Sequence, residues 1–401
     1  MVRARAHQML DLARAHVLED WRVDDARLHS TSKYVAQVVR ERYPQLDPPF
    51  HARWRHFVFN GRDLWLEIDE GRDYPGVEAR TRSAFDLAIT SVLLDAGAGP
   101  DWRYRDEQTG FVVGRSEGLA LASLRWFERG GLSDDPSDHL RADAAKLERI
   151  DVAALQDALQ VTRDNPLTGL EGRAALLNRL GAAMNSRADL FAREDSPRPG
   201  GLFDALMVRA SDEPGGALPA TAILDFVLDG FGSIWQDRPV LANLALGDCW
   251  PHPALQSSGM QPAQGYVPLH KLSQWLSYSL IEPLQQSGLR VLDTDSLTGL
   301  AEYRNGGLLI DMGVLVPRNP ADLTATHSVG SPLVVGWRAL TVALLDELAP
   351  LVRAELGVSV SVFPLACLLE GGTWAAGRKI AAAKRPGGVP PLTITSDGTV
   401  F

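Results

Sequence analysis

The chain has 401 residues, of which 45% are hydrophobic, and its 40 Lys and Arg residues against 50 Asp and Glu residues give a formal net charge of -10. This length and composition allow a large buried core, while the negative charge disfavours binding to a nucleic acid polymer. Two cysteines, Cys249 and Cys367, are too few for a disulfide framework. No stretch has the apolar length of a signal peptide or a membrane span. We therefore expect a cytoplasmic protein without membrane association.

Apolar residues recur at helical spacing through most of the chain, and this pattern predicts a mainly α-helical protein. Periodic runs at residues 85–93 and 170–180 predict core-facing helices, the second capped near residues 164–166. The longest run covers residues 333–356 and includes Pro350 as a kink. Short strands are predicted at residues 63–68, 110–113 and 358–363. The expected fold is compact and mainly α with a few short strands, in one domain over residues 1–401 or in two lobes of about residues 1–140 and 141–401 around a cleft.

Residues 48–57 combine two arginines, two histidines and three aromatic residues. Arg53, Arg55 and His56 are candidate substrate-binding residues, because arginines interleaved with aromatic rings can bind a phosphate or stack on a planar group. The same density of residues is also typical of a packing corner rich in cation–π contacts. The sequence leaves both interpretations open.

Asp248 and Trp250 lie in the segment of residues 247–252 and are further candidates for contact with a substrate. Asp248, Cys249 and His252 are also possible metal ligands. No second ligand pair follows at a recognisable spacing, so we predict no metal and no cofactor. The chain also lacks a phosphate-binding loop, a dinucleotide fingerprint and a nucleophile elbow, which disfavours a kinase, a dehydrogenase and a serine hydrolase.

Residues 268–284 predict a helix that Pro268 opens. At 100° per residue, Lys271, Gln274 and Tyr278 fall on the face opposite a row of leucines. A cation, an amide and a phenol that point the same way can bind a polar substrate. An ordinary solvated helix face is the alternative.

Another helix is predicted from residue 295 or 296 to residue 304, with Asn305-Gly306-Gly307 ending it. A ligand can approach the backbone closely beside such a glycine turn. The candidate site there consists of two carboxylates, a phenol and a guanidinium: Glu302, Tyr303, Arg304 and Asp311. A surface salt bridge beside a glycine C-cap is the alternative.

Four segments of this chain resemble the uracil-catabolism protein family of fungi and bacteria, long carried as a domain of unknown function: residues 50–57, 270–276, 297–307 and 396–401. The resemblance covers essentially the whole chain. It implies a role in the pathway that opens the uracil ring after the base becomes a nucleotide, with ribosylurea among its intermediates.

A second set of segments resembles the queuosine 5′-phosphate N-glycosidases, whose helical fold is similar to that of DNA glycosylases: residues 102–104, 114–124, 167–180, 231–237, 267–276, 295–315 and 370–375. Glu302-Tyr303-Arg304 lies where that family has Asp-Tyr-Arg. The carboxylate of this chain therefore reaches one methylene further. This resemblance implies a helical enzyme that breaks a ribosyl–nitrogen bond.

The two resemblances together predict a hydrolase that splits ribosylurea, or its 5′-phosphate, into urea and the sugar. Hydrolysis builds positive charge on the sugar ring, so the site needs a carboxylate near the anomeric carbon and a group that positions the water. Glu302 and Asp311 are the candidate carboxylates. Tyr303, Tyr278 or the Gln274 amide can donate a hydrogen bond or proton to the urea leaving group.

A 5′-phosphate requires cations, and four residues are candidates for binding it: Arg304, Lys271, Arg53 and Arg55. The expected partner is thus a small ribosyl compound, and the sequence does not predict an oligomeric state. A phosphoribosyltransferase is one alternative, although the sequence lacks the paired acids that follow a strand in such enzymes. A non-catalytic protein that binds an intermediate is the other.

Overall fold

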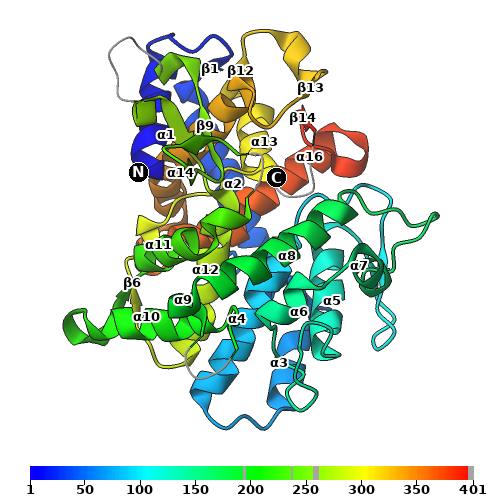
Figure 1. Ribbon diagram of the computed structural model, residues 1–401. Helices are drawn as coiled ribbons and strands as arrows, with labels where there is room; N and C mark the ends of the chain where they lie inside the picture. The colour runs from blue at the N-terminus through cyan, green and yellow to red at the C-terminus, as the bar shows by residue number, and fades with distance from the viewer. Residues whose placement is uncertain (193–195, 236–237, 256–261, 396–401) are drawn as a thin grey trace. The chain divides into compact units, whose positions relative to one another are not determined.

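The computed structural model describes residues 1–192, 196–235, 238–255 and 262–395. Residues 396–401, and residues 236 and 237 of the segment 231–237, lie outside the described residues. The described parts are α-helices joined by loops, with strands of two or three residues that pair only in twos (Figure 1). The prediction of a mainly α fold is thereby confirmed. Within the described ranges, no helix is long and apolar enough to cross a membrane.

Contacts divide the chain into two compact units, each of which combines segments distant in the sequence. Unit 1 contains Met1–His51, Asp237–Gln274 and Thr294–Thr395. Unit 2 contains Ala52–Gln236 and Trp275–Asp293. Helix α12 (Lys271–Gln286) begins in unit 1 and continues in unit 2.

The helices of unit 1 are α1 (Val2–Arg14), α2 (Leu28–Arg42), α13 (Tyr303–Asp311), α14 (Pro332–Leu356), α15 (Leu365–Leu368) and α16 (Trp374–Lys384). A π-helical turn, Leu369–Thr373, joins the last two. The antiparallel strand pairs are β1 (Trp21–Val23) with β12 (Leu315–Pro317), β7 (Val240–Leu241) with β8 (Leu244–Ala245), and β9 (Cys249–Pro251) with β10 (Tyr266–Pro268). The parallel pair is β13 (Thr326–His327) with β14 (Thr393–Ile394).

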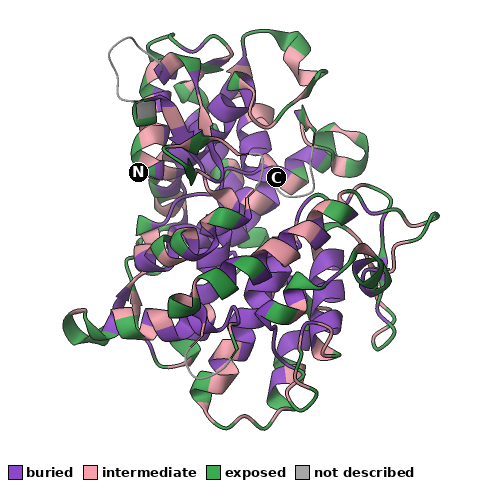
Figure 2. Cartoon of the chain, in the orientation of Figure 1, coloured by how far each residue is buried: buried purple, intermediate pink, exposed green. Residues whose placement is uncertain are grey.

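Helix α14 is the central helix of unit 1, since α1, α2 and α13 all pack against it. Ser331 caps its first turn by accepting the N–H of Val334 at 3.4 Å, and Pro332 occupies a position where a missing N–H costs nothing. Gly357 ends the helix with a left-handed φ of 72°. The helix predicted at residues 333–356 is confirmed, and it continues through Pro350. Figure 2 shows how much of the helical part of the chain is buried.

The helices of unit 2 are α3 (Leu64–Glu70), α4 (Val77–Leu93), α5 (Arg115–Glu128), α6 (Ala144–Glu148), α7 (Val152–Ala158), α8 (Leu170–Ser186), α9 (Ala188–Phe191), α10 (Gly201–Ser211) and α11 (Ala220–Phe231). Its strand pairs are β2 (Val58–Phe59) with β3 (Arg62–Asp63), β4 (Tyr104–Arg105) with β5 (Val112–Val113), and β6 (Leu218–Pro219) with β11 (Val291–Leu292). Helix α4 lies at the centre of this unit and packs against α5, α8 and α10. The strand predicted at residues 110–113 is confirmed in part as β5.

Two strand predictions are wrong. Residues 64–70 form α3, because Asp63 Oδ1 accepts the N–H groups of Trp65 and Leu66, both at 3.1 Å, and so starts a helix. Residues 358–363 form turns between α14 and α15. Val360 and Val362 are exposed there, so the alternation of Val and Ser buries no face.

The predicted start of α8 near residue 165 is also wrong. The helix begins at Leu170, after Gly169 in the left-handed conformation. Asn165 does not cap a helix. Its side chain accepts the N–H of Arg103 at 2.8 Å and donates to the Arg103 carbonyl at 2.8 Å, so it connects two loops.

Candidate active site

Glu302 is the N-cap of α13, which begins at Tyr303 and not near residue 295 as predicted. Its Oε2 atom accepts the N–H of Arg304 at 2.7 Å, and Oε1 accepts the N–H of Asn305 at 2.5 Å. These bonds satisfy two N–H groups that an α-helix otherwise leaves unpaired in its first turn. They also place a carboxylate at the positive end of the helix dipole.

The glycines after Glu302 lie inside α13 and do not end it, which corrects the second part of that prediction. A Cβ atom at Gly306 would lie 2.6 Å from the Trp337 ring. On the neighbouring helix α16, a Cβ atom at Gly377 would lie 2.1 Å from the Arg304 carbonyl oxygen. The glycines therefore serve close packing of α13 against α14 and α16, and this packing fixes the position of Glu302.

The Glu302 carboxyl is buried, with 5% of the residue exposed. Burial raises its pKa, while the two backbone donors and the positive charges of Lys271 and His51 act in the opposite direction. The net direction is upward. A buried carboxyl with a raised pKa beside cationic side chains is a common feature of catalytic sites.

Asp248 holds the start of α12 beside this carboxyl. The Lys271 N–H donates to Asp248 Oδ2 at 3.1 Å, and Trp250 Nε1 donates to Oδ1 at 2.8 Å. Arg338 on α14 donates to both oxygens, at 2.8 and 2.7 Å, and its Nε donates to the Ala301 carbonyl at 3.2 Å. Burial alone would raise the pKa of Asp248, but Arg338 and the other donors hold this pKa well below its ordinary range. Asp248 and Trp250 thus belong to the frame of the site.

Gln274 fixes the loop that leads to Glu302. Its Oε1 atom accepts the N–H of Thr298 at 3.2 Å, and only 1% of the residue is exposed. Tyr278, further along α12, is also fully buried. The alternative of a solvated helix face is therefore wrong at these two positions. The helix itself begins at Lys271, because Pro268 belongs to strand β10.

Sequence reasoning missed a second pair of ionisable groups in unit 1. His51 Nδ1 lies 2.7 Å from Glu370 Oε2, and both residues are buried. Glu370 belongs to the π-helical turn before α16, and Arg42 Nη2 lies 3.5 Å from its other oxygen. The His51 ring centroid lies 5.5 Å from that of Trp374. The only sequence signal for this pair was the concentration of arginines, histidines and aromatic residues at residues 48–57, and there the candidate that we selected was His56 and not His51.

The structure does not bring Asp311 to Glu302. Asp311 is the last residue of α13, about 13 Å along the helix axis from Glu302 at 1.5 Å per residue. Arg385 binds both of its carboxylate oxygens, at 2.7 and 2.5 Å. A carboxylate pair in a glycosidase lies roughly 5 to 9.5 Å apart. These two carboxylates therefore do not form such a pair.

Tyr303 and Arg304 contact each other at the start of α13. The Arg304 guanidinium carbon lies 4.8 Å from the Tyr303 ring centroid, and Nη1 donates to the Gly388 carbonyl at 2.8 Å. The cation is thus already held by an aromatic face and a backbone oxygen. Of the predicted residues, unit 1 gathers Glu302, Tyr303, Arg304, Lys271, Gln274, Asp248 and Trp250 around the start of α13 and the start of α12.

Asp311 also belongs to unit 1, whereas Tyr278, Arg53, Arg55 and His56 belong to unit 2. Arg53 is fully buried; its Nη1 donates to Asp95 at 2.7 Å, and its guanidinium carbon lies 5.6 Å from the Trp275 ring centroid. Burial lowers the pKa of Arg53, and Asp95 opposes this effect. The packing-corner interpretation describes these contacts well.

His56 and Arg55 are held in the same corner of unit 2. His56 Nδ1 lies 3.2 Å from Arg53 Nη1, and the His56 ring centroid lies 5.6 Å from that of Trp275. Arg55 Nη2 donates to Glu282 at 2.5 Å. Arg53 and Arg55, the two arginines of residues 48–57, are therefore both paired with carboxylates.

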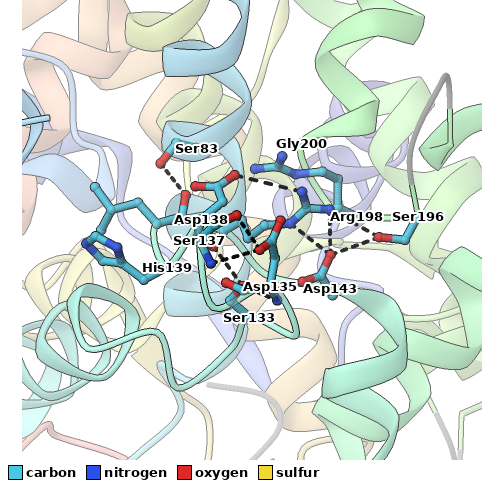
Figure 3. A network of polar contacts seen from close by, with 12 residues as sticks. Ser83, Ser133, Asp135, Ser137, Asp138, His139, Asp143, Ser196, Arg198 and Gly200 are labelled. Atoms are coloured by element: carbon cyan, nitrogen blue, oxygen red, sulfur yellow. Dashed lines mark hydrogen bonds and ion pairs between the residues drawn. The ribbon is translucent and has the colours of Figure 1, made fainter. Parts of the chain in front are cut away.

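A further polar network of unit 2 surrounds the loop of residues 133–143 (Figure 3). Asp86 accepts hydrogen bonds from Arg198 and from the Gly200 N–H, the latter at 2.6 Å. Asp143 accepts from Arg141 at 2.6 Å and from Ser196 at 3.0 Å. These carboxylates are satisfied by groups of the protein, so we assign them a structural role. Within the described ranges, no three His, Cys, Asp or Glu side chains gather as a metal site requires.

All 401 residues match a family model described as "Protein of unknown function (DUF1688)". The chain belongs to this family. It is 38% identical over 385 residues to "Uracil catabolism protein 4" of Lachancea kluyveri. The aligned residues cover 88% of this chain and 85% of that protein. It is 34% identical over 410 residues to "Protein urg3" of Schizosaccharomyces pombe, covering 100% of this chain and 96% of that protein.

The family membership confirms the first resemblance, and the resemblance to queuosine 5′-phosphate N-glycosidases stays a prediction. Two of the segments that carry the first resemblance, residues 270–276 and 297–307, contain Lys271, Gln274 and Glu302. The family signature and the buried site therefore coincide in unit 1.

Proposed function

We propose that this member of the family is an enzyme of uracil catabolism that hydrolyses the N-glycosidic bond of ribosylurea or of its 5′-phosphate. The products are urea and the corresponding sugar. The observation that carries the chemistry is Glu302, a buried carboxylate held at a helix N-terminus by two backbone N–H groups. The name of the Lachancea kluyveri relative, "Uracil catabolism protein 4", supports the pathway.

Glu302 is the group that stabilises the transition state. As the bond between C1′ and nitrogen lengthens, positive charge develops on the sugar ring, and a buried carboxylate stabilises that charge more strongly than water does. Its two backbone donors keep the oxygens in place, so little reorganisation accompanies the reaction. Because they already accept the Arg304 and Asn305 N–H groups, the oxygens act by charge.

Two polar groups complete the proposed site: Tyr303 acts on the leaving group, and Lys271 acts on the sugar phosphate. The nitrogen of urea is a poor leaving group as an anion and needs a proton, for which the Tyr303 phenol beside Glu302 is the donor. Lys271 lies within electrostatic range of Glu302 and supplies a cation for a sugar phosphate. Asp248 fixes the backbone at Lys271 and so sets the start of this helix.

The architecture disfavours the phosphoribosyltransferase alternative. Enzymes of that type bind their diphosphate substrate after a strand of a parallel sheet. The strands in the described part of the chain are two or three residues long and pair only in twos.

Incubation of the purified protein with synthetic ribosylurea and with its 5′-phosphate tests the proposal. Urea release from either compound is the expected result, and the ratio of the two rates gives the phosphate requirement. Consumption of phosphoribosyl diphosphate would support the transferase instead. Thermal stabilisation by ribosylurea without product over hours would indicate a binding protein, because binding stabilises the folded state without chemistry.

A further inference from the structure

The pair of His51 and Glu370 is the second buried acid–base group of unit 1, and the mechanism above leaves it unused. His51 Nδ1 lies 2.7 Å from Glu370 Oε2, and 4% and 5% of the two residues are exposed. The two residues are 319 positions apart in the chain. A buried histidine bonded to a buried carboxylate is a costly arrangement unless the two groups compensate each other.

The pair lies close to the candidate catalytic carboxyl. His51 lies within electrostatic range of Glu302, as Lys271 does. Glu370 lies on the π-helical turn Leu369–Thr373, which joins α15 to α16. Such turns occur mostly within α-helices and frequently at functional sites. Helix α16 in turn packs tightly on α13 through Gly377 and the Arg304 carbonyl, so the same element supports both acids.

The geometry assigns one tautomer to the neutral histidine. A carboxylate accepts hydrogen bonds, so His51 carries its proton on Nδ1 and its lone pair on Nε2. This is the arrangement by which a carboxylate orients a histidine base in hydrolases and stabilises the imidazolium that forms. The Arg42 guanidinium, 3.5 Å from the second oxygen of Glu370, fixes the carboxylate from the side of α2.

On the basis of the proposed function, we infer that His51 is the base for the attacking water and that Glu370 is the residue that positions it. The water oxygen bonds to C1′ as its proton passes to His51 Nε2. The C1′–nitrogen bond breaks, its electron pair goes to nitrogen, and the nitrogen takes a proton from the phenol donor. The proton on His51 then restores the phenol through solvent, so the net reaction consumes only water.

The His51 ring lies among groups from three elements of unit 1. Glu370 of the π-helical turn lies against His51 Nδ1, and Arg42 of α2 lies behind Glu370. Trp374 from α16 contributes an aromatic face. Glu370 orients the His51 ring, so we expect its loss to lower kcat with little change in KM.

The test compares four variants by the rate of urea release from ribosylurea and its 5′-phosphate. His51→Ala should lower kcat about 100-fold or more with little change in KM, and added imidazole should restore part of it. His51→Gln, which retains a polar group in the buried space, should be equally slow without responding to imidazole. Glu370→Gln should lower kcat about 10-fold with little change in KM. His7→Asn is the matched control, because His7 pairs with Asp346 in the same unit and should leave kcat unchanged.

The outcomes separate this role from the proposed function. A wild-type protein that releases urea while both His51 variants keep more than about a third of its kcat would overturn the role of His51 and leave the hydrolase proposal standing. A Glu370→Gln variant that keeps the wild-type kcat, or that changes KM alone, would overturn the positioning role of Glu370. A folded wild-type protein that releases no urea from either compound would overturn the proposed function and this role with it.

Discussion

Asp248 and Arg338 form a two-armed ion pair in the interior of unit 1, with nitrogen–oxygen distances of 2.8 and 2.7 Å. Ninety positions separate them in the chain. The same carboxylate receives the Lys271 N–H, and the same guanidinium binds the Ala301 carbonyl next to Glu302. One buried pair therefore connects α14 with the start of α12 and with the residue before α13.

Breaking this pair should destabilise the protein strongly. Arg338→Met leaves the Asp248 carboxylate buried without its cation, and we expect the free energy of unfolding to fall by about 3–5 kcal/mol. The double variant Asp248→Asn/Arg338→Met should recover part of that loss, because it leaves no isolated charge. Urea unfolding followed by circular dichroism measures both. Arg62→Met, which breaks an exposed pair with Glu67, is the control and should cost less than about 1 kcal/mol. Equal losses for the two arginine variants would contradict this account.

Glu302→Gln should abolish turnover while leaving the fold intact. The amide retains the size of the side chain but loses the charge that opposes the developing positive charge on the sugar, so we expect kcat to fall about 1,000-fold or more. Glu302→Asp shortens the side chain by one methylene and should retain more activity than the amide, since it keeps the charge. Urea release and the circular dichroism spectrum are the two readouts. A Gln variant with the wild-type rate would remove Glu302 from the mechanism.

The raised pKa of Glu302 makes a prediction about stability against pH. Burial places the folded-state pKa above the ordinary value of 4.5, so the folded protein binds this proton more tightly than the unfolded chain. The contribution of Glu302 to stability is therefore greatest below 4.5 and decreases as the pH rises through the folded-state pKa. The Gln side chain does not titrate. The difference in Tm, Glu302→Gln minus wild type, should therefore increase between pH 4 and pH 7 when both are measured by calorimetry at matched ionic strength. A difference that decreases over this range would show that the folded state lowers the pKa of Glu302.

Gly306→Ala tests the packing of α13. A Cβ atom at this position would lie 2.6 Å from the Trp337 ring, so the helices must move apart, and we expect a loss of about 1–3 kcal/mol in the free energy of unfolding. Gly232→Ala is the matched control: its backbone is helical and no atom lies within 4 Å of the added Cβ. It should be neutral or slightly stabilising, because Ala restricts the unfolded chain. If both substitutions changed the free energy of unfolding equally, close packing would not explain the glycine at position 306.

The parts of the fold that could be predicted are those with signals close together in the sequence. The long helix α14 has an apolar stripe, a Ser331 cap, Pro332 in its first turn and Gly357 after its end, all within one segment. The parts that could not be predicted depend on distant partners. Gly306 and Gly307 looked like the end of a helix because their packing partners, Trp337 for Gly306 and Pro391 for Gly307, lie far along the chain.

The same reason explains which site residues the sequence revealed. Glu302 stood out by type and by its neighbours, although its role as N-cap depended on where α13 begins. The pairing of His51 with Glu370 has no local signature, because 319 positions separate the two residues. Residues 64–68 looked like part of a strand because the capping bonds from Trp65 and Leu66 to Asp63 leave the alternating pattern unchanged.

The most direct test of the central claim is a ¹³C NMR time course with ribosylurea, and with its 5′-phosphate, labelled both at C1′ and at the urea carbon. Cleavage of the N-glycosidic bond predicts that the two labels separate into the C1 resonance of the free sugar and the resonance of intact urea, in equal amounts and at the same rate. Loss of the urea carbon as carbon dioxide with the sugar–nitrogen bond intact, or two unchanged signals with folded protein, would contradict the account.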